Sequence, residues 1–208
     1  MPKLVPPAVP AGRMRSLGQP TLRVDDDIVL RPWIAGDAPQ VVAAFADPDI
    51  RYWHMRAVDD EDEALAWIDG WKQQWDDEEA GNWAIVRTLA DGSEQVLGQG
   101  GLRCVDLFEG WGEITYWVVP AGRGTGVATR AAKVLSRWIL EDLGLVRLEL
   151  MHSTANEASC RVAGKAGFVA EGTLRHAVLH TDGWHDMHLH SRVATDLDLD
   201  RGLDRGQD

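Results

Sequence analysis

The glycine-rich segment at residues 120–129 contains the residue types best suited to binding a charged ligand. The β-branched and aromatic residues before it, at 114–119, predict a buried strand, which a proline then ends because proline cannot donate to a continuing ladder. Gly122, Gly124 and Gly126 allow positive φ and let a ligand approach the backbone closely. From there, apolar residues recur with helical spacing. A strand, a turn and a helix N-terminus in this order present backbone N–H groups to an anion, and phosphate is the expected anion.

The charge around this segment and the residues after its last glycine narrow the choice of phosphate ligand. A mononucleotide P-loop needs Lys followed by Ser or Thr, where Val127 and Ala128 stand. A dinucleotide fingerprint needs a third glycine at the position of Thr129. Both patterns fail, and the glycines alone are equally typical of an ordinary turn before a solvated basic face. Residues 114–140 contain no Asp or Glu, and their basic residues are Arg123, Arg130, Lys133 and Arg137.

Several short motifs lie along residues 28–195. Arg123-x-x-Gly126-x-Ala128 is preceded by Val118-x-Pro120 and followed by Asn156-x-x-Ser159 and Lys165-x-Gly167-Phe168. The run Glu113-Ile-Thr-Tyr-Trp-Val precedes these motifs, and Gly172-x-Leu174-Arg175 and Gly183-x-His185-Asp186 follow them. In their order and spacing the motifs resemble the GNAT superfamily of N-acetyltransferases, which bind acetyl-coenzyme A (acetyl-CoA). The run from Glu113 and the ending from Gly172 are similar to its RimJ/RimL-type branch, whose namesakes acetylate the N-termini of ribosomal proteins.

The resemblance implies an α/β (α+β) GNAT fold. We expect a mixed, mostly antiparallel twisted sheet with a central parallel βαβ unit, flanked by helices. The acetyltransferase domain is expected at residues 27–195. A flexible proline-rich arm at 1–26 and a charged tail at 196–208 are expected on either side.

The same resemblance implies where the coenzyme binds. Its pyrophosphate is expected on the glycine-rich loop, and its extended arm along the edge of the strand that ends at Val118. Asn156 is expected to contact the arm, although a plain helix N-cap would use the same residue. The expected cofactor-binding residues are Val118, Val119, Arg123, Gly124, Thr125, Gly126, Val127, Ala128, Thr129, Asn156 and Ser159.

Two residues are candidates for proton transfer. Glu113 enters the central strand and is the expected base for the amine, while a water-facing carboxylate remains the alternative because alternation alone does not orient it. A backbone N–H near Val119 is expected to hold the oxyanion, following the family pattern. Many family members protonate the leaving thiolate with a tyrosine where Ala163 stands, so Ser159 is the expected substitute and solvent the alternative.

The acceptor site is expected among tryptophans, with Trp53, Trp71 and Trp184 as its candidate walls. Acidic runs at 59–63 and 76–79 could attract a cationic amine, although such runs are usually solvated faces. His188 and His190 alternate along one strand as two metal ligands would. Because no cysteine or acidic residue has ligand spacing to them, we expect structural histidines and no metal.

The composition limits the kinds of partner that the protein can bind. The 208 residues carry a formal net charge of −12, which disfavours nucleic acid. Two cysteines form no disulfide framework, and neither a membrane-spanning run nor a secretory signal is present, so a cytoplasmic location and no membrane contact are expected. The sequence leaves a homodimer open.

These observations predict an enzyme that transfers an acetyl group from acetyl-CoA to a primary amine by direct attack in a ternary complex. The acceptor is a protein N-terminus or a small-molecule amine. Two alternatives remain: an acyltransferase that uses another donor such as succinyl-CoA, and a catalytically weak acyl-CoA-binding sensor or scaffold.

Overall fold

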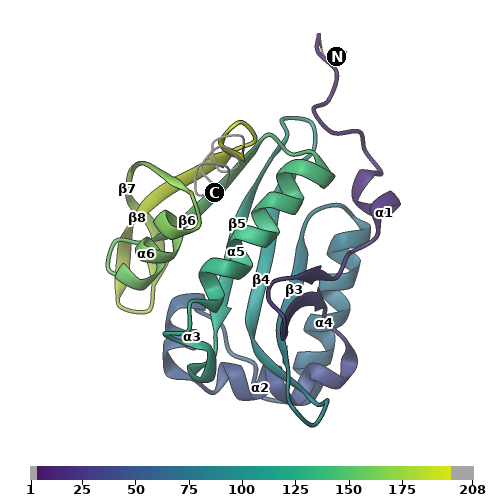
Figure 1. Cartoon of the computed structure of the whole chain (residues 1–208). Helices are drawn as coiled ribbons and strands as arrows, with labels where there is room; N and C mark the ends of the chain where they lie inside the picture. The colour runs from purple at the N-terminus through teal and green to yellow at the C-terminus, as the bar shows by residue number, and fades with distance from the viewer. Residues whose placement is uncertain (1–3, 198–208) are drawn as a thin grey trace, which may run out of the picture.

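One mixed sheet of eight strands organises the chain, in the order β1-β2-β3-β4-β5-β6-β8-β7 (Figure 1). The computed structural model describes residues 4–197. The strands are β1 (Leu22–Arg23), β2 (Ile28–Pro32), β3 (Gly81–Thr88), β4 (Glu94–Asp106), β5 (Trp111–Val118), β6 (Arg147–Ser153), β7 (Val169–His180) and β8 (Gly183–Val193). The helices are α1 (Arg13–Leu17), α2 (Ala38–Phe45), α3 (Pro48–His54), α4 (Glu61–Asp76), α5 (Val127–Trp138) and α6 (Glu157–Lys165), with 3-10 turns at Ala35–Asp37 and Pro120–Gly122 and a π-helical turn at Ile139–Leu143.

Only β5 and β6 pair in parallel among these strands, and α5 connects them. Every other neighbouring pair in the sheet is antiparallel. The predicted mixed, mostly antiparallel sheet with a central βαβ unit is therefore confirmed. No helix within residues 4–197 is long and apolar enough to cross a membrane.

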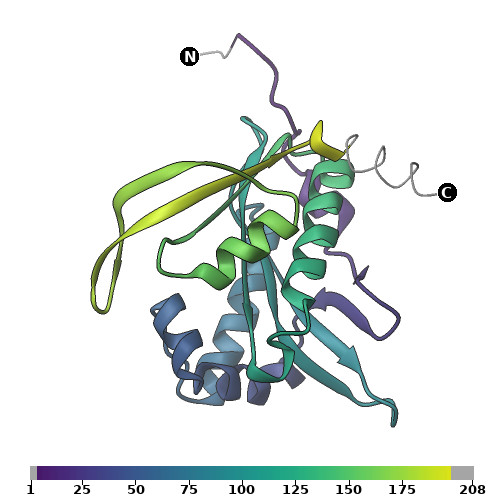
Figure 2. The same cartoon turned by 60° about the vertical axis from the view of Figure 1, so that its left-hand side comes forward.

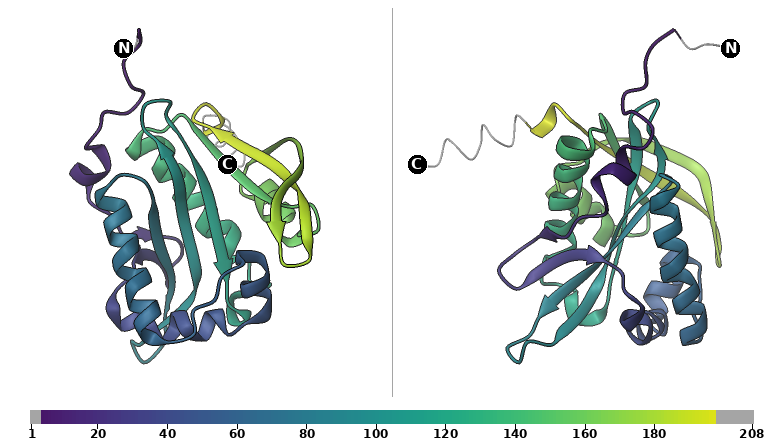
Figure 3. Two further views of the ribbon diagram at one scale, coloured as in Figure 1. Left: turned by 180° about the vertical axis from the view of Figure 1, so that it is seen from behind. Right: turned by 90° about the vertical axis from the view of Figure 1, so that its right-hand side faces the viewer.

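Helices cover both faces of the sheet. In Figure 1, α5 and α6 lie in front of the strands, and Figure 2 shows α6 between the β7–β8 hairpin and the rest of the sheet. Figure 3 shows α4 and α2 against the opposite face. The apolar stripe of α5, including Val127, Ala131 and Leu135, belongs to one buried cluster. A second cluster joins α2 and α4 to the other face through residues such as Phe45 and Ile68.

The helix α3 follows α2 closely, and the dipeptide Asp47-Pro48 begins it. The Asp47 side chain accepts a hydrogen bond from the Ile50 N–H at 3.0 Å, and proline is well suited to a first helical position. The helix carries Trp53 and His54 near its end.

The N-terminal arm packs against the domain from Ala8 onwards, where the N–H groups of Ala8 and Val9 donate to the carbonyls of Phe108 and Leu107. Val9 and Met14 are buried in the main core, and the N–H groups of Gly12 and Met14 donate to the Glu78 carboxylate. The prolines of this segment suggested a flexible arm, but composition alone does not reveal hydrogen bonds and buried side chains of this kind. The domain boundaries themselves stay a prediction, and residues 198–208 of the expected charged tail lie outside the described residues.

The two acidic runs serve largely to fix the local structure. Asp60 caps α4 by accepting the Glu63 N–H at 2.9 Å, and Glu63 accepts the Asp59 N–H at 2.9 Å. Glu78 in the second run anchors the N-terminal arm.

Candidate active site

β5 and β6 separate after only three paired residues, and a groove opens between them. Their ladder joins residues 111–113 to residues 147–149. Beyond it, β5 runs on to Val118 and β6 to Ser153 without pairing to each other. A groove of about 480 Å³ follows, walled by α3, β5, the glycine-rich loop, α5 and α6; its lining includes Asp49, Trp53, Tyr116, Val118, Arg123, Gly124, Gly126, Val127, Ala128, Thr129, Asn156, Ser159 and Lys165.

The glycine-rich loop takes the conformation that its glycines permit. Gly124 has φ 74° and Gly126 has φ 78°, both in the left-handed region that disfavours other residues. Gly126 is the N-cap of α5, whose first turn has neither an acidic residue nor a side-chain cap from the described part of the chain. The first N–H groups of α5 therefore remain available, at the positive end of the helix, where Val127, Ala128 and Thr129 line the groove.

Arg123 lines the groove, but its guanidinium group bonds to carboxylates at the start of α3. Its Nη2 lies 2.6 Å from Asp47 Oδ1, and its Nη1 lies 2.9 Å from Asp49 Oδ2. Burial of Asp47 opposes its ionisation, yet the hydrogen bonds from Arg123 and the Ile50 amide keep the pKa of Asp47 below its usual value. Arg123 thus joins the loop to α3, and its charge is partly neutralised before any ligand arrives.

Arg130 braces the loop from α5. Its Nε lies 2.6 Å from Asp25 Oδ2, and its Nη1 donates to the Thr125 carbonyl at 2.8 Å. The Thr125 hydroxyl donates to the Gly122 carbonyl at 2.8 Å. Thr125 is therefore used inside the loop and, unlike its neighbours, does not line the groove.

The backbone of Val118, rather than that of Val119, faces the groove. The Val119 N–H donates to the Leu97 carbonyl of β4 at 2.9 Å. The Val119 N–H therefore belongs to the β4–β5 ladder, and the expectation that a backbone N–H near Val119 holds an oxyanion stays a prediction that another N–H would have to meet. In an antiparallel pair the next residue points its N–H and C=O the other way, so those of Val118 point towards the gap. The Arg123 Nε lies 3.2 Å from the Val118 carbonyl, as this orientation requires.

The opposite wall of the groove is the start of α6. Asn156 caps this helix, since its Oδ1 accepts the Ser159 N–H at 3.0 Å. Asn156 also lines the groove, so its capping role leaves it available to a ligand. Ser159 lies one turn into the helix and lines the same groove.

Tyr116 is a groove residue whose side chain the sequence did not single out. Its hydroxyl is buried and has no hydrogen-bond partner of good geometry within residues 4–197. Burial raises the pKa of Tyr116 to about 12, against the opposing effect of the neighbouring Ser159 hydroxyl. Tyr116 therefore remains a protonated donor across the physiological range. Because side chains alternate along a strand, Tyr116 must share a face with Val118, and this pattern could have pointed to it in the sequence. Which of the two faces borders the groove is known only from the sheet register.

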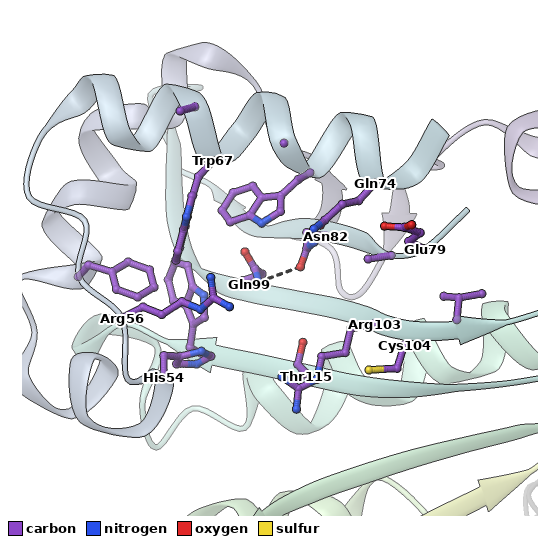
Figure 4. A pocket seen from close by; sticks show the side chains of 17 residues that line it. His54, Arg56, Trp67, Gln74, Glu79, Asn82, Gln99, Arg103, Cys104 and Thr115 are labelled. Carbon is purple, nitrogen blue, oxygen red and sulfur yellow. Dashed lines mark hydrogen bonds between the residues drawn. The ribbon is translucent and has the colours of Figure 1, made fainter. Parts of the chain in front are cut away.

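A second cavity, of about 600 Å³, lies on the other face of β5, under α4 (Figure 4). Trp117 and His54 line both this cavity and the groove. Its other walls combine aromatic and polar side chains: Phe45, Arg56, Trp67, Trp71, Gln74, Glu79, Asn82, Gln99, Arg103, Cys104 and Thr115.

Glu113 faces this second cavity's side of the sheet. It lies directly opposite Arg103 in the β4–β5 register, and the two form a bidentate ion pair with distances of 2.7 and 3.0 Å. Arg103 and Thr115, which share that face, line the cavity. The Glu113 side chain is 5% exposed, so the alternative of a water-facing carboxylate does not describe it.

The predicted tryptophan walls fall in three different places. Trp71 lines the second cavity, whereas Trp53 lines the groove on α3. Trp184 is 57% exposed near the β7–β8 turn and lines neither space. Gln99 also lines the second cavity, although its sequence context does not mark it. Its buried Oε1 has no partner in the described residues, while its amide donates to Asn82 at 3.0 Å. A donor such as an amine would satisfy this oxygen.

The chain matches known acetyltransferases. Residues 27–169 match the family model described as "Acetyltransferase (GNAT) domain". The chain is 25% identical over 169 residues to the uncharacterized N-acetyltransferase YoaA of Bacillus subtilis, which covers 81% of this chain and 94% of that protein. It is 30% identical over 81 residues to the ribosomal-protein-serine acetyltransferase of Escherichia coli, covering 39% and 45%. RimL, a ribosomal L7/L12 α-N-protein acetyltransferase solved in complex with coenzyme A, shares the fold with a TM-score of 0.73 and 17% identity, covering 84% of this chain and 98% of that one.

His54, in the wall shared by the two spaces, should make stability depend on pH. Burial lowers the pKa of His54 to about 4, helped by the charges of Arg103 and Arg56 and opposed by a backbone hydrogen bond involving Tyr116. The unfolded chain titrates this histidine near 6.5, so its contribution is complete above that value and is lost as pH falls towards 4. On going from pH 7.5 to pH 5, the free energy of unfolding should fall by on the order of 2 kcal/mol because of this histidine.

Urea unfolding of His54→Asn at both pH values should lack that loss, and exposed His176→Asn is the control. Equal pH dependence in both variants would contradict the assignment.

Proposed function

The chain belongs to the GNAT acetyltransferase family, in its RimJ/RimL-type branch, and from this premise we propose that it acetylates the α-amine of a polypeptide N-terminus with acetyl-CoA. One observation carries the proposal: β5 divides two spaces, and Trp117 and His54 line both of them. A thioester in the groove and an amine in the opposite cavity would meet at this strand. Holding the two reactants in place can supply up to ~7–11 kcal/mol of the barrier.

The groove supports acetyl-CoA as the donor. The uncapped start of α5 and the positive-φ glycines suit a pyrophosphate. The groove-facing N–H and C=O of Val118 suit the amide-bearing arm, which would pair there as an added strand does. Asn156 and Ser159 supply polar contacts on the opposite wall.

The Glu113–Arg103 pair favours an acceptor that is easy to deprotonate. Both carboxylate oxygens of Glu113 already accept hydrogen bonds from Arg103, so the guanidinium group competes with the acceptor amine for them. An α-amine with a pKa of about 7.7–8 needs little help at neutral pH, whereas a lysine-like amine at about 10.4 needs much more. Glu113 then accepts the proton through a water molecule in the second cavity.

Glu113→Gln should change the pH dependence of turnover. At pH 6.5 we expect kcat/KM to fall by about 10²-fold, the usual contribution of a general base. At pH 9 the loss should be smaller, because an α-amine is then already neutral. Exposed Glu109→Gln carries the same chemical change outside the site and is the control. An unchanged pH–rate profile in Glu113→Gln would remove Glu113 from the mechanism.

In this proposal Tyr116 and Ser159, which both line the groove, stabilise the departing thiolate. Full proton transfer from a phenol of pKa about 12 to a thiolate of about 8.5 is uphill by roughly 5 kcal/mol. Tyr116 therefore acts as a hydrogen-bond donor, to the sulfur or to Ser159, and solvent completes the protonation. This role uses a buried hydroxyl that otherwise has no good partner in the described residues.

Tyr116→Phe should lower kcat by about 10- to 100-fold, the value of one hydrogen bond to a developing charge. KM for acetyl-CoA should change much less, because the bond strengthens as the sulfur becomes negative. If the two hydroxyls act together, Tyr116→Phe with Ser159→Ala should lose less than the sum of the single losses. Tyr52→Phe, whose hydroxyl bonds to Asp182 instead, is the matched control. Wild-type kcat in Tyr116→Phe would leave solvent as the only donor.

The acceptor class can be tested with a panel of amines. Peptides with free N-termini, the same peptides with blocked N-termini and one lysine, and small polyamines would be incubated with acetyl-CoA. Thiol release and mass spectrometry would report rate and site. We expect turnover with free N-termini at neutral pH. Acetylation confined to lysine or polyamines would reject the N-terminal assignment while retaining the acetyltransferase.

A further inference from the structure

A cluster of three histidines and one cysteine lies beneath α6. One ligand atom from each of His152, Cys160, His188 and His190 lies within 4.8 Å of the other three. His152 comes from β6, His188 and His190 from β8, and Cys160 from α6. We propose that these four side chains bind one zinc-type divalent transition-metal ion.

The sheet register brings the histidines together. His152 lies directly opposite His188, and His190 follows two residues later on the same face. The rings of His152 and His190 are stacked with centroids 5.1 Å apart, and that of His188 meets His152 edge-on at 5.3 Å. No cysteine has ligand spacing to these histidines in the sequence, because only the fold brings Cys160 of α6 close to them.

The separations fit a tetrahedral ion after small side-chain rotations. Bonds of about 2.0–2.3 Å place the ligand atoms of such an ion roughly 3.3–3.8 Å apart. The Nε2 atoms of His152 and His190 are 3.2 Å apart, and the widest spacing in the cluster is 4.8 Å. An inward shift of about 1 Å at the most distant ligand completes the site.

The hydrogen bonds of His152 leave the correct nitrogen free. Its Nδ1 lies 2.8 Å from the Ser153 carbonyl, which can only accept, so Nδ1 carries the proton. In neutral His152 the Nε2 atom then carries a lone pair, which is directed at His190. Backbone carbonyls hold metal-binding histidines in this way, which fixes the tautomer.

The two ring nitrogens of His190 are not both hydrogen-bonded. It is 4% exposed, and its Nδ1 is buried without a hydrogen bond within residues 4–197. If His190 Nε2 donates to His152, Nδ1 is left as a buried acceptor with no donor. A metal ion bound by both Nε2 atoms removes the need for one imidazole to donate to the other, and the proton of His190 then lies on Nδ1.

The chemistry of the donors selects the ion. Three imidazoles and a thiolate suit zinc and cobalt, whereas magnesium and calcium require oxygen ligands. Four protein ligands leave no open position, so the ion is structural rather than catalytic. It would fasten α6 to β6 and β8, and α6 carries Asn156 and Ser159 into the groove.

Cobalt(II) titration of the full-length chain, with any affinity tag removed and metal first stripped with a chelator, tests the proposal. We expect one ion per chain, intense visible bands of tetrahedral cobalt and a near-ultraviolet thiolate-to-cobalt charge-transfer band. Cys160→Ser should abolish the charge-transfer band, and His188→Asn should weaken cobalt affinity at least 100-fold. Zinc should raise the Tm of the wild type more than that of Cys160→Ser.

Two matched variants control for non-specific binding. Cys104→Ser changes the other cysteine of the chain, on β4, and His176→Asn changes an exposed histidine on β7. Both should keep the wild-type stoichiometry and spectrum. Failure of the wild-type chain to bind zinc or cobalt would overturn the proposal, whatever the variants do. So would a charge-transfer band that survives Cys160→Ser, or cobalt binding that His188→Asn and His176→Asn affect equally.

Discussion

The early separation of β5 from β6 is the constraint on which the rest of the site depends. A strand that leaves its neighbour exposes backbone N–H and C=O groups, and a buried group without a partner costs about 1–3 kcal/mol. The ladder ends at Glu113 and Glu149, and the gap-facing groups of Tyr116 and Val118 lie beyond it. Arg123 donates a hydrogen bond to the Val118 carbonyl and so satisfies one of these groups. An extended ligand that carries amides can form hydrogen bonds with other groups of the same strand edge. The gap therefore destabilises the fold but favours ligands of this shape.

The same strand divides the groove from the second cavity because its side chains alternate. Tyr116 and Val118 line the groove and Thr115 lines the cavity under α4, while Glu113 lies on the same face of the sheet as Thr115 without lining that cavity. Trp117 lines both spaces because it stands at the end of the strand, where the sheet no longer separates them. One strand therefore presents the Tyr116 hydroxyl to the groove and the Glu113 carboxylate to the opposite face of the sheet, on which the second cavity lies.

Local signals in the sequence predicted the parts of the site that local physics builds. The glycines, the helical spacing after Gly126 and the N-cap residue Asn156 each act within a few residues, and all were placed correctly. Features that depend on the sheet register were beyond the sequence. The direction of the Glu113 side chain, the pairing of Arg123 with Asp47 and Asp49, and the approach of Cys160 to the histidines all join segments that are far apart in the chain. The start of α3 is hard to predict for a different reason: proline both ends one helix and begins the next.

The positive charge of the glycine-rich loop is less important to anion binding than its backbone. Arg123 and Arg130 each hold a carboxylate at 2.6 Å, and their side chains are both 38% exposed. Ion pairs with that exposure are worth about 0–1 kcal/mol, and their charges largely cancel at a distance. Hydrogen bonds from backbone N–H groups to a charged phosphate are worth about 1.5–3 kcal/mol each, and the start of α5 offers several at the positive end of a helix. The arginines therefore act mainly by fixing the loop in shape. This explains how a chain with a net charge of −12 can present a site for a polyanion without a strongly basic surface.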